Sequence, residues 1–236
     1  VEALMRKIAT RDGFGNVLAD GVMRAANTIG GEAPNFAVYT HKGNAPHVHD
    51  DRGLWNIAFS MAVSDMGSIP AGDMGDVGDL LDTIGDNFLD PARAFDADYI
   101  PKCSALMWRR GHFIDCLGIC MFVAGVSFKL VADTLNAVTG WDFTWQECTE
   151  VGERVLTMMR SFNVKNGHTR ADNCLSPRIL EAPVDGPAKG VSIAPKIDSM
   201  LDIYYEALGW DMDGRPLPKT LNKLGLKDVA KELAKI

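Results

Sequence analysis

The segment TWQECTEVGERVLTMMRSF, residues 144–162, gives the clearest indication of the fold. Thr144 and Glu147 stand three residues apart at the start of a mixed apolar and charged run, which is the spacing of a capping box. In that motif the two side chains bond reciprocally to the backbone at the beginning of a helix. The segment therefore predicts a long α-helix.

Further helices are expected on both sides of this segment. Residues 196–210 predict a strong helix, and residues 217–236 predict two short ones. Residues 105–137 are mostly apolar and are expected to be helical, with an interruption near residues 115–120. Because strand signals are few, the predicted fold class is mainly α.

The N-terminal part also predicts helices. Residues 1–30 are expected to form two, and the second has Gly30 at its end and one apolar stripe made by Leu18, Val22, Ala25, Ala26 and Ile29. Residues 54–67 predict an apolar helix. Residues 163–190 form a long irregular stretch, and loops of that length usually carry function or wrap a partner.

Composition excludes several classes of protein. The chain has 236 residues, of which 47% are hydrophobic and 23% charged, as expected of a globular protein. A net charge of −7 argues against nucleic-acid or anionic-membrane binding. No apolar run is long enough to span a bilayer. Five cysteines without a secretory signal predict a reducing, cytoplasmic compartment. The first residue is not methionine, so we expect a fragment, a processed chain or one part of a split protein.

Residues 115–120, DCLGIC, combine groups that could line one side of a cofactor-binding site, within a segment that looks buried. The Asp115 carboxylate can accept two N–H donors from a planar heterocycle, Gly118 lets a ligand approach the backbone, and the Cys120 thiolate can bind iron. The alternative is a structural set: an acid that caps a helix, a glycine at a tight packing point and a buried thiol. The hexamer alone does not separate the two interpretations.

Several motifs along the chain resemble the tungsten-pterin aldehyde ferredoxin oxidoreductase family. The hexamer at 115–120 resembles the family's Asp-x-x-Gly-(Leu or similar)-Cys motif. Residues 7–30 are similar to K-I-A-x-R-x-G-x-G-x-x-L-A-x-G, and HDDRG at 49–53 stands where the family has D-P-R-G. Residues 161–179 and 204–226 resemble two further family segments, so the likeness covers nearly the whole chain.

The resemblance implies a site. Asp115 would hydrogen-bond one of the two pterins that chelate tungsten or molybdenum, beside Gly118, and Ile119 would offer backbone contacts to the same pterin. Cys120 would be the fourth ligand, and the metal-binding residue, of a [4Fe–4S] cluster. The other three cysteine ligands, the first pterin-binding domain and the second Asp-x-x-Gly motif are absent from the sequence, so residues outside this chain would complete both cofactors.

The resemblance also implies an organisation and partners. Residues 1–45 would end the middle helical domain, and residues 46–236 would form the helical C-terminal domain. The missing N-terminal portion, ferredoxin or an electron-transfer subunit, and further copies in an oligomer are the expected partners. The implied activity is anaerobic oxidation of an aldehyde to a carboxylate. Two alternatives stay open: a benzoyl-CoA-type aromatic-ring reductase subunit of the same family, and a non-catalytic helical interaction domain.

One stretch departs from the family pattern. The family helix Y-A-T-S-N-R-G-x-C-H carries a histidine towards the metal. Counting from Gly67, that histidine falls on Pro70, and Asp65-Met66 replace the Asn-Arg pair. Proline cannot move a proton, so the acid/base residue, and any catalytic residue in this chain, stays unassigned.

The remaining candidates have mainly structural interpretations. His47, His49 and Asp50 have the spacing of a zinc site, but we expect a solvated loop that shares a hydrogen-bond network with Arg52.

Three further candidate residues remain: His112, Cys116 and His168. His112 is expected either to support the site residues from behind or simply to pack there, and Cys116 is expected not to be a ligand. His168 is expected to lie either beside a substrate channel or on the surface.

Overall fold

The computed structural model describes residues 1–46, 50–67, 93–119 and 128–236. Within these ranges the chain is built of helices and loops, and an isolated antiparallel bridge between Trp210 and Pro216 is the one strand-like pairing. The predicted mainly α class is therefore confirmed.

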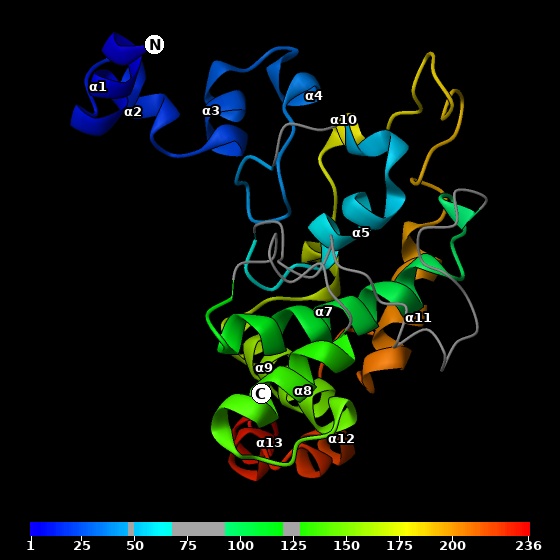
Figure 1. The fold of residues 1–236 in the computed structure, drawn as a ribbon. Helices are drawn as coiled ribbons and strands as arrows, with labels where there is room; N and C mark the ends of the chain where they lie inside the picture. Colours follow the sequence, from blue (N-terminus) through cyan, green and yellow to red (C-terminus); the bar gives the residue numbers. More distant parts are fainter. Residues whose placement is uncertain (47–49, 68–92, 120–127) are drawn as a thin grey trace.

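Figure 1 shows the order and arrangement of the helices. The first part of the chain contains α1 (Glu2–Thr10), α2 (Phe14–Leu18), α3 (Val22–Ile29), α4 (Ala33–Phe36), the 3-10 helix η1 (Asp51–Gly53) and α5 (Trp55–Val63). The central part contains α7 (Ile100–Cys116), α8 (Phe128–Thr139) and α9 (Trp145–Lys165). The last part contains η4 (Arg170–Asp172), α10 (Pro177–Leu180), α11 (Ile197–Leu208), α12 (Pro218–Lys223) and α13 (Lys227–Leu233).

Helix α9 begins as the sequence predicts. The Thr144 hydroxyl accepts a hydrogen bond from the Glu147 backbone N–H at 3.2 Å, and the Glu147 carboxylate accepts one from the Thr144 N–H at 2.8 Å. This reciprocal pair satisfies two of the donors that a helix start leaves unpaired. The 21-residue helix contacts α7, α8 and α13.

The packing of α7 on α9 is the most extensive contact between described helices. The two backbones approach closely at Gly152, where an added Cβ atom would lie 1.7 Å from the Arg109 carbonyl oxygen. Next to this crossing the Arg109 guanidinium lies 3.4 Å from the Glu153 carboxylate and donates to the Ala207 carbonyl at 2.7 Å. One arginine therefore connects α7 to both α9 and α11.

Three apolar cores surround these helices. The largest joins α5, α7, α9 and α11 through residues such as Phe59, Trp108 and Tyr204. The second packs α7 on α8 and the start of α9, with Phe113 and Phe128 in edge-to-face contact. The third joins the end of α9 to α12 and α13. Because α7 supplies side chains to the first two cores, packing holds it on two sides.

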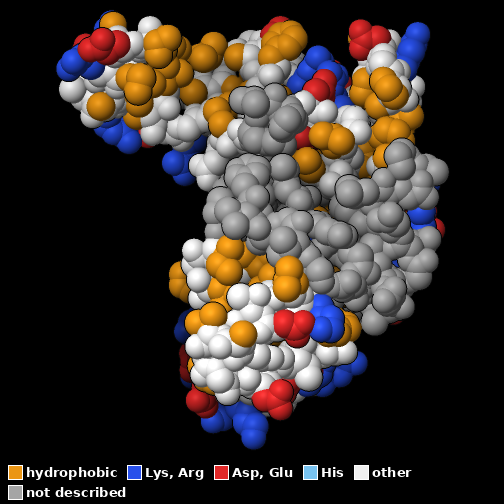
Figure 2. Space-filling view, in the orientation of Figure 1, with side chains coloured by type: hydrophobic (Ala, Val, Ile, Leu, Met, Phe, Trp, Pro, Cys, Tyr) orange, Lys and Arg blue, Asp and Glu red, His pale blue; other side chains and the backbone are white. Residues whose placement is uncertain are grey.

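The first 37 residues form a helical arm that projects from the body (Figure 1). Helix α1 has no buried residue, and α4 contacts α10 of the body. The arm bears an apolar groove of about 450 Å³, and Figure 2 shows hydrophobic side chains gathered over this region. The groove is lined by Leu18, Val22, Ala25, Ala26, Ile29, Ala33, Phe36 and Ala37.

The prediction of two helices in residues 1–30 is wrong in one respect, because the second is divided into α2 and α3. Gly21 lies between them with a φ of +89°, a conformation that ends a regular helix. The Met23 N–H then bonds to the Gly43 carbonyl at 3.3 Å, which turns α3 towards the following loop. The predicted apolar stripe nevertheless survives the break, since all five of its residues line the groove.

The other predicted helices agree with the structure. The interruption near residues 115–120 is confirmed by the end of α7 at Cys116 and the start of α8 at Phe128. Two short helices follow residue 217, as expected. Among the described residues no helix has both the length and the apolar character needed to cross a bilayer.

The close approach at Gly152 makes a testable prediction about stability. In Gly152→Ala the new methyl group would overlap the Arg109 carbonyl, so α7 and α9 must separate, at a cost of about 3 kcal/mol that exceeds alanine's gain in helix propensity. We expect the melting temperature of the purified protein to fall by about 6 °C or more. The control is Glu150→Ala on the exposed side of α9, where the change should stay within about 0.5 kcal/mol. Equal melting temperatures for the two variants would contradict this account.

Candidate functional site

The end of α7 carries the sequence motif singled out above. The helix stops at Cys116, and Gly118 follows with a φ of +67° and donates its N–H to the Asp115 carbonyl at 3.0 Å. A glycine in this conformation is a common way to end a helix. Apart from its two chain neighbours, no atom of the described residues lies within 4 Å of where a Gly118 Cβ would be, so the described residues leave the space beside this backbone open.

The expected burial of the Asp115 segment is wrong for the described chain. The Asp115 side chain is 43% exposed, although Ile114, one residue earlier, is in the second core. Asp115 is the penultimate residue of α7 and lies outside the second core, although Ile114 before it and Leu117 after it both pack there. A carboxylate at a helix C-terminus is also unfavourable, by about 0.3–1 kcal/mol, because it faces the negative end of the helix dipole.

His112 lies one turn before Asp115 and is buried, as expected of a packing histidine. Its side chain is 3% exposed, and its ring centre is 5.4 Å from that of Trp108. The Nδ1 atom lies 3.5 Å from the Asp115 Oδ2 atom, whereas Nε2 has no hydrogen-bond partner among the described residues. Burial lowers the pKa of His112, and the Asp115 carboxylate opposes that shift only in part, so the imidazole is neutral near pH 7.

The rest of the motif is partly outside the described ranges. Ile119 is 37% exposed, and Cys116 is an exposed free thiol. Cys120 lies outside the described residues. Within the part of the chain that the structure describes, no three His, Cys, Asp or Glu side chains are grouped so as to hold a metal ion.

The described residues fit a planar heterocycle with N–H donors. An ionised Asp115 offers only acceptor oxygens, and its exposure lets a ligand reach them. The open backbone at Gly118 leaves room for a flat ring next to those oxygens. An acid at the unfavourable end of a helix, beside open space, is a more natural ligand contact than a packing element.

A second polar cluster fixes the end of α5. Asp65, at one of the positions that depart from the family pattern, is buried and lies 3.6 Å from the Arg160 guanidinium. The Asn163 amide donates to the Asp65 carboxylate and to its backbone carbonyl, each at 2.9 Å. Burial raises the pKa of Asp65, although Arg160 acts in the opposite direction.

Arg160 extends this cluster to the last third of the chain. Its side chain is 1% exposed, and it donates to the Gly214 carbonyl at 2.7 Å and to the Asn173 amide oxygen at 3.0 Å. The Tyr205 hydroxyl donates to the same oxygen at 2.6 Å. The network therefore ties α5, α9 and α11 together just before residues 68–92, which include Pro70 and lie outside the described ranges.

His168 is half-buried and lies beside His41, with ring centres 5.5 Å apart. The His41 Nδ1–H donates to the Met61 carbonyl at 3.1 Å, and burial lowers the His41 pKa to about 4. His168 also lines a surface cavity of about 440 Å³ with Asp213 and Arg215. His168 thus lines a surface cavity, and its role beside a substrate channel stays a prediction.

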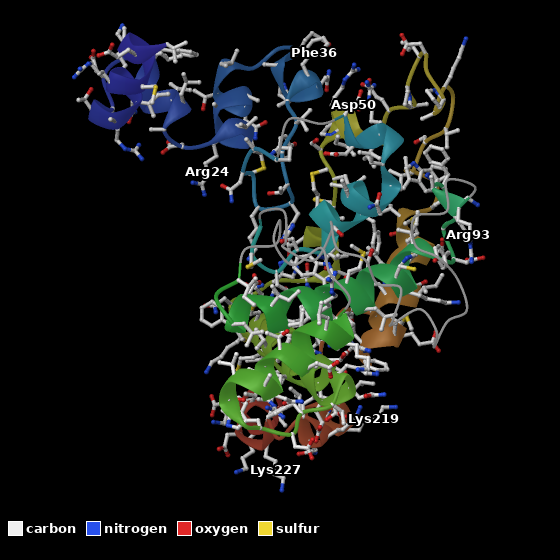
Figure 3. All side chains as sticks on the ribbon, viewed as in Figure 1. Arg24, Phe36, Asp50, Arg93, Lys219 and Lys227 are labelled. Carbon is white, nitrogen blue, oxygen red and sulfur yellow. The ribbon has the colours of Figure 1, made fainter. Side chains whose placement is uncertain are left out.

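The loop before α5 agrees in part with the prediction of a solvated loop that is hydrogen-bonded to Arg52. Asp50 accepts two hydrogen bonds from the Arg52 guanidinium, at 2.8 and 2.6 Å, and it lies at the surface near the start of α5 (Figure 3). This pair lowers the pKa of Asp50. His47 and His49 lie outside the described residues, so the zinc alternative stays a prediction.

Comparisons with known proteins agree on one family. The family described as aldehyde ferredoxin oxidoreductase, domains 2 and 3, matches residues 1–226. The chain is 33% identical, over 95% of its length, to a tungsten-containing aldehyde ferredoxin oxidoreductase of Pyrococcus furiosus. It is 27% identical, over 99% of its length, to an aliphatic sulfonate oxidoreductase, WOR-like subunit, of the same organism. It spans only 36% and 35% of the length of these two relatives.

One solved structure shares the fold. It is the active site complex BamBC of benzoyl coenzyme A reductase in complex with 1,5-dienoyl-CoA, with a TM-score of 0.73 and 19% identity. The match covers 98% of this chain and 39% of the solved chain. At this identity the likeness shows the fold alone.

The buried His41 predicts that folding stability depends on pH. Its pKa is about 4 in the folded chain against an ordinary value of 6.5. The unfolded chain therefore binds the extra proton between those two values, so stability is lost as pH falls through that window. One such group contributes at most about 1.4 kcal/mol per pH unit. In His41→Asn the amide can still donate to Met61 but cannot titrate. We therefore expect the dependence of the free energy of unfolding on pH to fall by up to that amount, as measured by denaturant unfolding at several pH values. A slope equal to that of the wild type would refute the assignment.

Proposed function

This chain belongs to the aldehyde ferredoxin oxidoreductase family, and we propose that it is the C-terminal portion of a tungsten-bis-pterin, iron–sulfur oxidoreductase. The proposed reaction is oxidation of an aldehyde to a carboxylate, with electrons passed to ferredoxin. The name of the P. furiosus relative supports this, since that protein is a tungsten-containing aldehyde ferredoxin oxidoreductase, similar over 95% of this chain. The remaining length of the relatives represents the portion that would complete the cofactors.

The observation that carries the proposal is the exposed Asp115 carboxylate beside the open backbone of Gly118. We propose that Asp115 accepts N–H hydrogen bonds from one pterin and that Ile119 contacts the same pterin through its backbone. We also propose that Cys120 ligates a [4Fe–4S] cluster, as the sequence motif indicates. Residues 1–45 would belong to the middle domain and residues 46–236 to the C-terminal domain.

The described residues would orient the cofactor. When bound, the tungsten–pterin group supplies the redox chemistry at the substrate, and the iron–sulfur cluster carries electrons singly. This chain would hold and orient the pterin. Asp115 would bind the edge of the ring by charge-assisted hydrogen bonds, and Gly118 would let the ring lie against the backbone. The packing of α7 in two cores keeps these contacts in place.

The departure at residues 65–70 favours a second candidate function. Asp65 has a buried structural role in place of the family's Asn-Arg pair, and Pro70 replaces the family histidine. An enzyme without that histidine would need another route for protons, so a benzoyl-CoA-type ring reductase is the alternative. Turnover of aldehydes with ferredoxin supports the first candidate, and turnover of aryl-CoA thioesters without aldehyde oxidation supports the second.

The first test concerns Asp115. Asp115→Asn replaces an acceptor oxygen by a donor amide that faces the pterin N–H groups, so the enzyme purified anaerobically with its other portion should lose tungsten and pterin. Loss of one charge-assisted hydrogen bond corresponds to about 1.5–3 kcal/mol, or a tenfold or greater loss of affinity.

The matched control is Asp133→Asn, an exposed acid on α8 that pairs with Lys129 at 2.6 Å, and it should keep both components. Full tungsten and pterin content in Asp115→Asn would rule the assignment out. A wild-type enzyme without tungsten, molybdenum or iron would instead favour the non-catalytic interaction domain.

The second test concerns the two neighbouring cysteines. Cys120→Ser should lower the iron content and abolish the cluster's electron paramagnetic resonance signal, because a serine oxygen is a poorer iron ligand than a thiolate. Cys116→Ser, at an exposed thiol four residues earlier, should leave iron unchanged. Cys120 would lose its assigned role if its variant kept all its iron, or if the Cys116 variant alone lost iron.

A further inference from the structure

We propose that His112 is a positioning residue that holds the Asp115 carboxylate for the pterin. The inference rests on the proposed role of Asp115 and adds a residue that the family motif does not include. His112 comes one helical turn before the motif, on the same face of α7 as Asp115.

The geometry supports a buried donor next to an exposed acceptor. The His112 ring packs against Trp108 of the first core, and its side chain is only 3% exposed. The Asp115 side chain is 43% exposed and contributes no apolar packing of its own. Its Oδ2 atom lies 3.5 Å from His112 Nδ1, a long contact of the kind that shortens when a ligand fills a site.

The protonation of His112 suits this task. A neutral imidazole carries one N–H, and Nδ1 is the nitrogen that faces a carboxylate, so the proton belongs there. The hydrogen bond orients Asp115 without cancelling its negative charge, which leaves the other oxygen lone pairs free for the pterin. It also explains why Nε2 can remain buried without a partner among the described residues, because Nε2 then carries no proton to place.

A purely structural role makes a different prediction. If His112 only filled space behind Asp115, a side chain of similar volume would replace it, whether or not it carried an N–H. If it positions Asp115, the replacement must donate at the place of Nδ1. Asparagine can do this, because its amide nitrogen occupies nearly the position of Nδ1, whereas methionine fills the space but donates nothing.

The experiment compares His112→Met and His112→Asn in the complete enzyme, purified anaerobically with the portion that completes the cofactors. The readouts are tungsten and pterin content per chain and their rate of loss during dialysis against a chelator. We expect the methionine variant to lose the cofactor about three- to tenfold faster, as removal of one hydrogen bond implies, and the asparagine variant to behave as the wild type. Thermal unfolding checks that both variants fold.

A double variant separates this inference from the proposed function. If His112 acts through Asp115, His112→Met should add nothing in the Asp115→Asn background. Equal losses in the two His112 variants, an additive loss in the double variant, or wild-type retention in His112→Met would each overturn the inference, provided that Asp115→Asn alone loses cofactor. If Asp115→Asn retains it, the proposed function itself fails.

Discussion

The close contact of α7 and α9 at Gly152 is the constraint on which the rest of the structure depends. Without a side chain at this position the Arg109 carbonyl can lie against the α9 backbone, and the Arg109–Glu153 pair forms beside it. Helix α7 then serves two cores, because it borders α5 and α11 on one side and α8 on the other, and α9 contributes to all three cores. The C-terminal end of α7, which bears Asp115, is thereby fixed only six residues beyond the crossing.

A second constraint acts at the other end of α9. Arg160 is almost fully buried, and its hydrogen bonds to Gly214 and Asn173, together with its ion pair to Asp65, reach three separate segments. Removing a partner from such a group costs far more than the interaction contributes, because a buried charge would be left uncompensated. The segment that precedes Pro70 is therefore held by polar interactions, whereas the end of α7 is held by apolar ones. The two segments differ in what would loosen them.

The sequence predicts local features better than it predicts long-range polar contacts. The capping box at Thr144 and Glu147 acts within four residues, so the start of α9 could be read directly. The Asp65–Arg160 pair joins residues far apart in the chain, so local patterns predict it poorly. The sequence offers one local indication, because Arg160 lies four residues from both Leu156 and Val164 on the buried face of α9. The apolar neighbours of Asp115 predict a buried segment, but they do not indicate where the helix ends, and the structure leaves the Asp115 side chain 43% exposed.

The arm formed by the first 37 residues has a practical meaning for handling this chain. Its groove is lined by eight apolar residues, of which Ile29 and Phe36 are 56% and 68% exposed. Apolar surface of this kind favours contact with any available hydrophobic body, including detergents, resins and misfolded neighbours. Recombinant protein made from these 236 residues alone should therefore bind nonspecifically to surfaces and aggregate at high concentration. Co-expression with the portion proposed to complete the cofactors is the natural way to obtain it in a well-behaved state.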